Sequence, residues 1–233
     1  MSASIAKNIV GERFGAEKIT RNDMLGSFIQ QGLNKADAES ESLVQITPNS
    51  AHSSFLTDKS SIAGSDTTAT AIRSTMLLIA TSPNTYSKLQ SEIDNAIKNK
   101  LISSPVTNAE AKKLPYLQAC IKEGLRMWPP ITGLMPKVSP TDDTINGQHI
   151  PAGTKVCWCA WRVFRNKEVF GDNAEVFRPG RWLETDEELL KLMETTAELA
   201  FSSGRWQCLG KSIAFIELNK VFVEVRIHGL PLR

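Results

Sequence analysis

Apolar residues recur at helical spacing along most of the chain and predict five helical segments. These segments cover residues 1–46, 62–80, 83–98, 114–127 and 209–224. Proline marks several of their ends: Pro83 suits the first turn of a helix, and Pro129 and Pro130 stop the helix that precedes them. Leu117, Cys120, Ile121 and Leu125 are expected to face inward. The other residues that mark the helices are Met24, Leu25, Phe28 and Ile29 on one face of the first, Tyr86, Leu89, Ile93 and Ile97 in one apolar stripe, and Ile213, Ile216, Phe222 and Val223 among the apolar positions of the last.

The rest of the chain breaks this pattern in three places. Residues 47–61 contain Pro48 and little periodicity, so we expect a loop or a disordered insert there. Residues 144–150 contain Asn146-Gly147, which predicts a hairpin, and a turn at residues 151–153 precedes a strand at 156–158. Residues 163–182 are rich in aromatics, Arg, Gly and Pro, and we expect packed irregular chain. The predicted fold class is mainly α with a small antiparallel β element.

Composition and charge narrow the function classes. The 233 residues carry 27 Lys+Arg against 25 Asp+Glu, so no long-range field attracts nucleic acid, and we expect no nucleic-acid partner. The longest apolar run, residues 76–80, is far below the ~20 residues of a membrane span, and the first ten residues lack the apolar core of a signal peptide. Four cysteines are too few for a disulfide scaffold.

Glu123 and Arg126 are three residues apart on one predicted helix, so their side chains are neighbours. A surface ion pair is the simplest interpretation. The helix is otherwise apolar, however, and a buried carboxylate and guanidinium need further partners. Arg181, in the segment FRPGRW, is the candidate for a third member.

The segment AGSDTT, residues 63–68, places poor helix formers inside a predicted helix. Its hydroxyl and carboxylate groups can compete for backbone hydrogen bonds and open the helix locally, next to a place that holds a water or a small ligand. The alternative is an N-cap, in which Ser65 or Asp66 starts the helix.

Cys208 lies in FSSGRWQCLG, directly before the last predicted helix. A helix N-terminus stabilises a thiolate, and Gly204 and Gly210 allow close approach of a flat ligand. A buried inert thiol and a simply reactive thiolate are the alternatives. Cys157 and Cys159 share one strand face, but nothing completes a zinc set. Cys120 is expected in the core, and His52, His149 and His228 are isolated.

The ordered set AGSDTT, EGLR, FRPGRW and FSSGRWQCLG resembles the C-terminal half of a cytochrome P450, the haem-thiolate monooxygenase family. The resemblance runs from about residue 10 to residue 224, and its wording is similar to the fungal pisatin-demethylase-like branch, which serves secondary metabolism. It implies an incomplete cytochrome P450 fold. It also marks residues 47–61 as an insert foreign to the family and residues 225–233 as an aberrant tail, both explained by a retained intron or a wrong gene model.

The resemblance implies roles for individual residues. Cys208 matches the axial thiolate ligand of haem iron, and Asp66 and Thr67 match the acid–alcohol pair that relays protons. Glu123, Arg126 and Arg181 match a buried charge triad. The residues matched to positions around the haem are Ala63, Gly64, Lys137, Phe201, Gly204, Trp206 and Gly210.

Two of these positions depart from the family pattern. Trp206 stands where most members have an arginine that contacts a haem propionate, and its indole N–H is the expected substitute donor. Gly180 stands where most members have a glutamate, which implies the loss of a local ion pair.

The implied activity is insertion of one oxygen atom from O2 into a small apolar organic substrate. The implied cofactor is heme b (iron protoporphyrin IX), and the implied partner is an NADPH-dependent P450 reductase. Full-length members lie on the cytosolic face of the endoplasmic reticulum membrane, whereas we expect this chain, without an anchor, to be soluble or aggregated. A truncated, non-catalytic remnant is the alternative. A haem-thiolate rearranging enzyme is disfavoured because Asp66 and Thr67 are intact.

Overall fold

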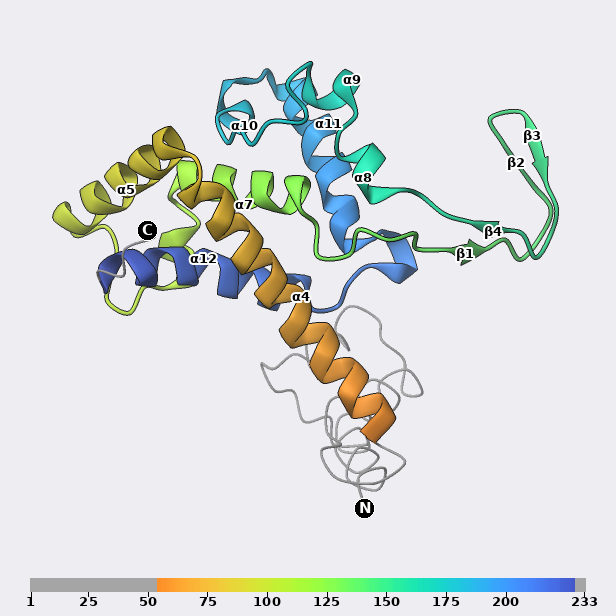
Figure 1. The fold of residues 1–233 in the computed structure, drawn as a ribbon, viewed down its shortest axis with the longest axis horizontal. Coiled ribbons are helices and arrows are strands. Elements are labelled where there is room, and N and C mark those ends of the chain that lie inside the picture. Colours follow the sequence, from red (N-terminus) through yellow and green to blue (C-terminus); the bar gives the residue numbers. More distant parts are fainter. Residues whose placement is uncertain (1–53, 229–233) are drawn as a thin grey trace, which may run out of the picture. The chain divides into compact units, whose positions relative to one another are not determined.

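The computed structural model describes residues 54–228, which are mainly helical with two small antiparallel sheets (Figure 1). The predicted fold class is therefore confirmed. The predicted helix over residues 1–46 lies outside the described residues. The elements are α4 (Ser54–Ala80), α5 (Pro83–Lys98), α6 (Asn108–Ala111), α7 (Pro115–Met127), β1 (Lys137–Val138), β2 (Asp143–Ile145), β3 (Gln148–Ile150), β4 (Lys155–Val156), α8 (Ala160–Val163), α9 (Lys167–Phe170), α10 (Arg181–Glu184), α11 (Glu187–Glu198) and α12 (Lys211–Ile227).

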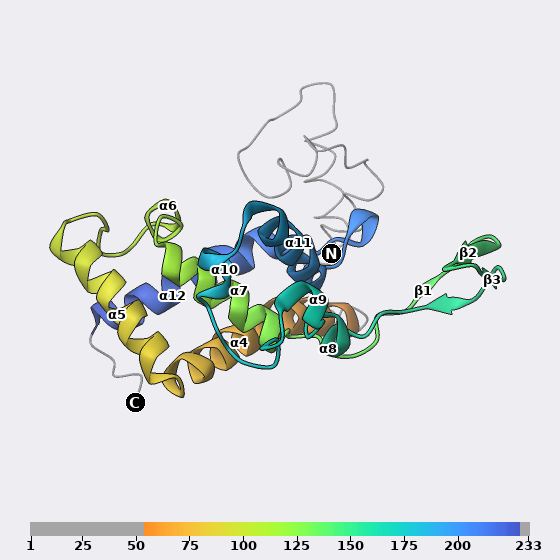
Figure 2. The same ribbon diagram turned by 90° about the horizontal axis from the view of Figure 1, so that it is seen from above.

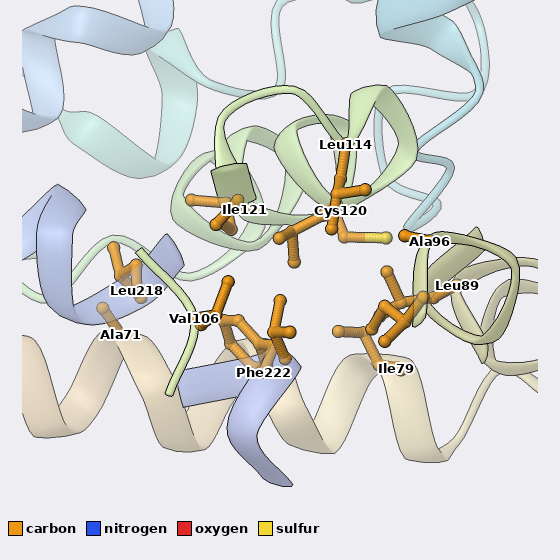
Figure 3. Packing of buried hydrophobic residues seen from close by; sticks show 14 of the residues in the cluster. Ala71, Ile79, Leu89, Ala96, Val106, Leu114, Cys120, Ile121, Leu218 and Phe222 are labelled. Carbon is orange, nitrogen blue, oxygen red and sulfur yellow. The ribbon is translucent and has the colours of Figure 1, made fainter. Parts of the chain in front are cut away.

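The chain divides into two compact units, Met1–Asp66 and Thr67–Arg233, and the boundary falls within α4. In the second unit, α5, α7, α12 and the later turns of α4 enclose one hydrophobic core (Figure 3). Its buried members include Ala71, Ile79, Leu89, Ile93, Leu117, Cys120, Ile121, Leu125, Leu218, Phe222 and Val223. Burial of each large apolar side chain contributes about 1.5–3 kcal/mol, so this core is the main source of stability.

The four described residues predicted to face inward, Leu117, Cys120, Ile121 and Leu125, are buried, whereas one residue of the apolar stripe on α5 and two apolar residues of α12 are exposed. Ile97, Ile213 and Ile216 are 42%, 39% and 41% exposed. In α5 the buried stripe continues from Ile93 to Ala96, because residues spaced by three lie on the same face of a helix as well as residues spaced by four. Ile97 therefore faces outward. On α12 the two isoleucines belong to the first two turns, and the buried residues Leu218, Asn219, Phe222 and Val223 come later in the helix.

Helix α7 holds two members of the expected charge triad, and its ends are set by sequence. Pro115 occupies the first turn, and the helix ends before Trp128-Pro129, as predicted. Glu92 of α5 accepts hydrogen bonds from the backbone N–H groups of Tyr116 and Leu117 at 2.8 and 2.9 Å. An acid from a neighbouring helix thus pairs the orphan donors at the start of α7.

The β element follows the turn signals in the sequence. Strands β2 and β3 pair antiparallel, with Ile145 opposite Gln148. Asn146 and Gly147 have φ of +51° and +78°, as the favoured two-residue hairpin turn requires. β1 pairs antiparallel with β4, and the paired segments extend away from the helices in both views (Figures 1 and 2).

The start of α4 and the end of α12 differ from the predictions, and helices α6 and α11 were not predicted. α4 begins at Ser54, so residues 54–61 of the expected loop are helical, and residues 47–53 lie outside the described residues. No Pro or Gly occurs between residues 54 and 61, and Ser and Thr weaken a helix by only a few tenths of a kcal/mol each. α12 continues through Ile227, and Arg226 binds Asp94 through two hydrogen bonds of 2.8 and 2.7 Å.

Helix α11 was not predicted. Asp186 caps it by accepting a hydrogen bond from Leu189 N at 3.0 Å, and two glutamates occupy its first turn. Its buried Met193 joins Trp182 and Phe170 in a second cluster. The signal was present in the sequence as an N-cap, an acidic first turn and apolar residues at helical spacing.

Candidate functional site

Glu123 is fully buried in α7 and accepts hydrogen bonds from four residues. Its Oε2 accepts from Arg126 Nε, and its Oε1 from Arg126 Nη2, both at 2.9 Å. Arg181 Nε donates to Oε1 at 2.9 Å, Arg178 N to Oε1 at 2.8 Å, and Trp182 Nε1 to Oε2 at 2.9 Å. We call Glu123, Arg126, Arg181 and Trp182 the Glu123 hub. The interpretation of Glu123–Arg126 as a surface ion pair is wrong.

The two arginines of the hub also bind backbone carbonyls of the irregular segment. Arg126 Nη1 donates to the carbonyls of Phe164 and Ala174 at 2.6 and 2.7 Å. Arg181 donates to the carbonyl of Phe170, and its Nη2 to the carbonyls of Asn173 and Val176 at 2.9 and 3.0 Å. Desolvation is the main cause that lowers the pKa of Arg181, and Glu123 opposes it.

The hub therefore explains how residues 163–182 pack although they hold only short helices. A buried backbone carbonyl needs a donor, and the guanidinium groups supply donors in a fixed fork. Sequence reasoning found the three charged members. It missed Trp182, whose buried indole N–H needs an acceptor, and Asn173, whose Oδ1 accepts from Arg181 Nη1 at 2.9 Å.

An ion pair lies beside Gly180. Arg178 binds Glu184, four residues after Gly180, and both side chains are about half exposed. A Cβ at Gly180 would lie 2.6 Å from Glu184 Oε1. Glu184 therefore occupies the space beside residue 180, although an exposed pair of this kind contributes no more than about 1 kcal/mol.

Cys208 is exposed in the turn that leads into α12. Its backbone N–H donates to the Phe201 carbonyl at 2.8 Å, which closes the loop that carries the thiol. Phe201 packs on Phe215 of α12, with ring centroids 5.4 Å apart. The interpretation of Cys208 as a buried inert thiol is therefore wrong, because its thiol faces outward from a loop held on both sides.

Gly204 and Gly210 flank the thiol in different ways. Gly204 has φ of +58°, which favours glycine, and a Cβ there would meet open space. A Cβ at Gly210 would lie 3.8 Å from Cys208 Sγ. Glycine at position 210 thus keeps one side of the sulfur uncovered.

Ser202 is the strained residue of this loop, with φ of +60° and ψ of −169°, a region that only glycine adopts readily. We expect Ser202→Gly to stabilise the chain by about 1–2 kcal/mol, because it removes the Cβ from this conformation. Urea denaturation measures the change. Gly204→Ala is the matched control and should destabilise, since it adds a Cβ at positive φ. An unchanged or lower stability of Ser202→Gly would contradict the expectation.

Lys137 and Trp206, both matched to haem-contacting positions, lie together although 69 residues separate them. Lys137 Nζ is 4.5 Å from the centroid of the Trp206 ring. Lys137 belongs to β1 and is half-buried, whereas Trp206 precedes Cys208 and is 54% exposed. The contact thus brings a cation from the β1–β4 sheet to the cysteine loop.

The residues of AGSDTT lie within α4, which is α-helical throughout Ser54–Ala80. The N-cap interpretation of Ser65 or Asp66 is therefore wrong, and the helix shows no widened turn at this point. Gly64 and Asp66 are exposed, Thr67 is half-buried, and the side chain of Ala63 is outside the described residues. A Cβ at Gly64 would meet no atom within 4 Å.

Within residues 54–228, the remaining cysteines and histidines form no metal site. Cys120 lies in the core as predicted, with its sulfur among the side chains of Leu89, Ala96 and Leu114 (Figure 3), and burial raises the pKa of its thiol. Cys157 and Cys159 are exposed and follow β4 rather than lying in it. Among residues 54–228, no cluster of three or more His, Cys, Asp or Glu is placed to hold a metal ion.

The side chains around Cys208 fit a flat, mostly apolar group with acidic edges. Trp206, Leu209, Ile213 and Ile216 are 39–54% exposed near the thiol in the chain, which is unusual for large apolar residues on one short stretch. The thiol supplies a soft ligand suited to iron, and Lys137 supplies a positive charge. The donor set therefore fits a haem.

Comparison with known proteins gives the family directly. The sequence model of the family described as Cytochrome P450 matches residues 7–225. The chain belongs to the cytochrome P450 family. It is 44% identical over 221 residues to the cytochrome P450 monooxygenase ABA1 of Pyricularia oryzae, a match that covers 94% of this chain and 40% of that protein.

Other fungal P450 proteins are similar. The P450 monooxygenase aba1 of Botryotinia fuckeliana is 42% identical over 223 residues, which are 95% of this chain and 41% of the relative. The pisatin demethylase of Fusarium vanettenii is 37% identical over 164 residues, which are 70% of this chain and 31% of that enzyme. The predicted fungal branch is confirmed. The chain spans about 40% of the length of the first two relatives.

Proposed function

We propose that this chain binds haem b through the Cys208 thiolate and contributes the haem-thiolate region of a monooxygenase. Supporting this is the exposed thiol at the start of α12, between Phe201 and a run of exposed apolar side chains. The matched relatives are named monooxygenases, which makes this an oxidoreductase family. When bound, the haem supplies the activation of O2, and its axial thiolate favours cleavage of the O–O bond.

The residues of this chain then have separate tasks. Cys208 holds the iron, and Phe201 packs beside the loop that presents it. Asp66 and Thr67 hold and move protons at the carboxylate and the hydroxyl oxygen. Ala63 and Gly64, which have little or no side chain, leave room on α4, and Lys137 holds a carboxylate of the cofactor.

The substrate and partners follow from the same proposal. We propose a small apolar organic substrate, with electrons from an NADPH-dependent P450 reductase and O2 as the second reactant. We propose the cytosolic face of the endoplasmic reticulum as the place of the reaction. Within residues 54–228, none of the helices combines the length and the apolar character needed to cross a bilayer.

The haem site makes a spectroscopic prediction. The chain, expressed with haem precursor, reduced and exposed to CO, should show the Soret band of a thiolate-ligated haem. Cys208→Ser should lose that band, because serine offers no thiolate, whereas Cys157→Ser, which removes another exposed thiol, should keep it. A thiolate-type band in Cys208→Ser would overturn the assignment.

A non-catalytic haem-binding remnant is the second candidate. The thiolate-type band combined with no turnover in the presence of reductase and NADPH would support the remnant. Oxidation of NADPH coupled to formation of a hydroxylated product would support the monooxygenase.

Lys137 and Trp206 make a second prediction about cofactor retention. Lys137→Ala and Trp206→Ala should each increase the rate of haem transfer to apomyoglobin several-fold. A cation–π contact at an exposed site contributes about 0.5–1 kcal/mol, and either variant removes it. Lys137→Ala also removes the positive charge, whereas Trp206→Ala removes the ring that holds this charge in place. The double variant should be little faster than either single variant. Additive effects would show that the two side chains act separately.

We also propose that residues 47–61 are an insert foreign to the family and that residues 225–233 are an aberrant tail. Helix α12 includes residues 225–227 of this tail. Sequencing of transcripts across both junctions tests this. Messages that mostly encode TPNSAHSSFLTDKSS would contradict the insert.

A further inference from the structure

Asn219 lies on the buried face of α12, the helix that begins after the Cys208 loop. Its side chain is 0% exposed, and it is the single polar residue buried on α12 within the described part of the chain. Its buried neighbours Leu218, Phe222 and Val223 are apolar. A buried amide is unfavourable unless both its N–H and its C=O find partners. Asn219 must therefore be paired by other helices.

Both ends of the Asn219 amide are paired. Gln118 Nε2 of α7 donates to Asn219 Oδ1 at 3.0 Å, and Asn219 Nδ2 donates to Asn108 Oδ1 at 2.8 Å. Gln118 Nε2 also donates to the Ala111 carbonyl at 3.1 Å. Asn108 and Ala111 are the first and last residues of α6. The three amides thus join α6, α7 and α12.

The far end of α12 is held separately. Glu224 Oε1 accepts a hydrogen bond from Val106 N at 2.5 Å, and Arg226 binds Asp94. Toward Cys208, the next side-chain hydrogen bond of α12 among the described residues is that of Lys211 to Glu198 at 2.8 Å, and this pair is partly exposed. The apolar contacts of α12 are not directional, so they tolerate small rotations of the helix. The hydrogen bonds of Asn219 do not.

We propose that Asn219 is a positioning residue that fixes the rotation of α12 and thereby the direction in which the turn before this helix presents Cys208. The consequence for catalysis rests on the proposed function, because it requires Cys208 to be the iron ligand. A single buried amide sets register between helices in coiled coils, at some loss of stability. Asn219 sets the rotation of α12 against α6 and α7 in the same way.

The rotation is measured by pulsed electron paramagnetic resonance between spin labels carried on non-natural amino acids at Lys98 of α5 and Glu217 of α12, both exposed. The parent chain should give one narrow distance distribution. Asn219→Leu should broaden it or add a second population of at least a quarter of the molecules. Gln118→Met should act similarly, because it removes the same hydrogen bond from α7.

Val223→Ala is the matched control, since it truncates a buried side chain of the same helix without removing a directional bond. It should keep the narrow distribution. An unchanged distribution in Asn219→Leu, or equal broadening in Val223→Ala, would overturn the proposal. If Asn219→Leu does not fold, Asn108→Ala replaces it, because this variant removes one hydrogen-bond partner of Asn219 at a partly buried position. A broadened distance distribution would again support the proposal, and an unchanged one would overturn it.

The haem-loaded chain separates this inference from the proposed function. Asn219→Leu should raise the share of reduced, CO-bound haem without thiolate ligation at least twofold, and Val223→Ala should not. An unchanged share, with a broadened distance distribution, would overturn the link to Cys208. A parent chain without any thiolate-type band would refute the proposed function alone, because the distance measurement needs no haem.

Discussion

Glu123→Ala should destabilise the chain by about 3–5 kcal/mol, the effect of removing one partner from a buried ion pair. Glu123 is the carboxylate shared by Arg126 and Arg181, whose side chains are 0% and 4% exposed. Without it, neither buried guanidinium group has a negatively charged partner, and the Trp182 indole loses its acceptor. Native stabilities are about 5–15 kcal/mol, so a large part of the total is lost.

Urea denaturation followed by tryptophan fluorescence measures this loss. Glu184→Gln is the matched control, because it removes a carboxylate from an exposed pair with Arg178 and should change stability by less than about 1 kcal/mol. Glu123→Gln keeps the shape of the side chain but presents an amide N–H group to the donors around it. Its stability should therefore lie between those of Glu123→Ala and Glu184→Gln. Similar stabilities for Glu123→Ala and Glu184→Gln would show that the hub does not hold the fold.

Local chemistry made much of this site predictable. Pro115 and Pro129 fix α7, Asn146-Gly147 fixes the hairpin, and Glu123 and Arg126 are neighbours wherever the helix forms. The loop from Phe201 to Gly210 is likewise a continuous segment. Each feature depends on residues a few positions apart, and short-range rules suffice for these.

What the sequence did not reveal depends on residues far apart in the chain. Trp206 lies against Lys137 because the β1–β4 sheet approaches the cysteine loop, and no local pattern encodes this approach. Asn219 reads as an ordinary polar residue until α6 and α7 are packed against it. The outward direction of Ile213 and Ile216 has the same origin, since periodicity gives a helix two candidate faces when apolar residues occur on both.

Gly124→Ala should destabilise the chain by about 1–3 kcal/mol, because it overpacks the contact between α7 and α4. A Cβ at position 124 would lie 2.1 Å from Thr75 Oγ1, 2.7 Å from its Cγ2 and 2.8 Å from its Cβ. Thr75 is 0% exposed and β-branched, so it has no free rotamer into which to move. The two helices must separate, and urea denaturation measures the loss.

Gly64→Ala is the matched control in a helix with open space at the new Cβ, and it should stabilise by about 0.5–1 kcal/mol through helix propensity alone. A loss of stability in Gly124→Ala, opposite to the gain in Gly64→Ala, would therefore be due to overpacking between the helices and not to helix propensity. Thr75→Gly should relieve the clash, so the double variant Gly124→Ala/Thr75→Gly should be more stable than the sum of the single effects. Additive effects would mean that α4 and α7 do not meet at this pair.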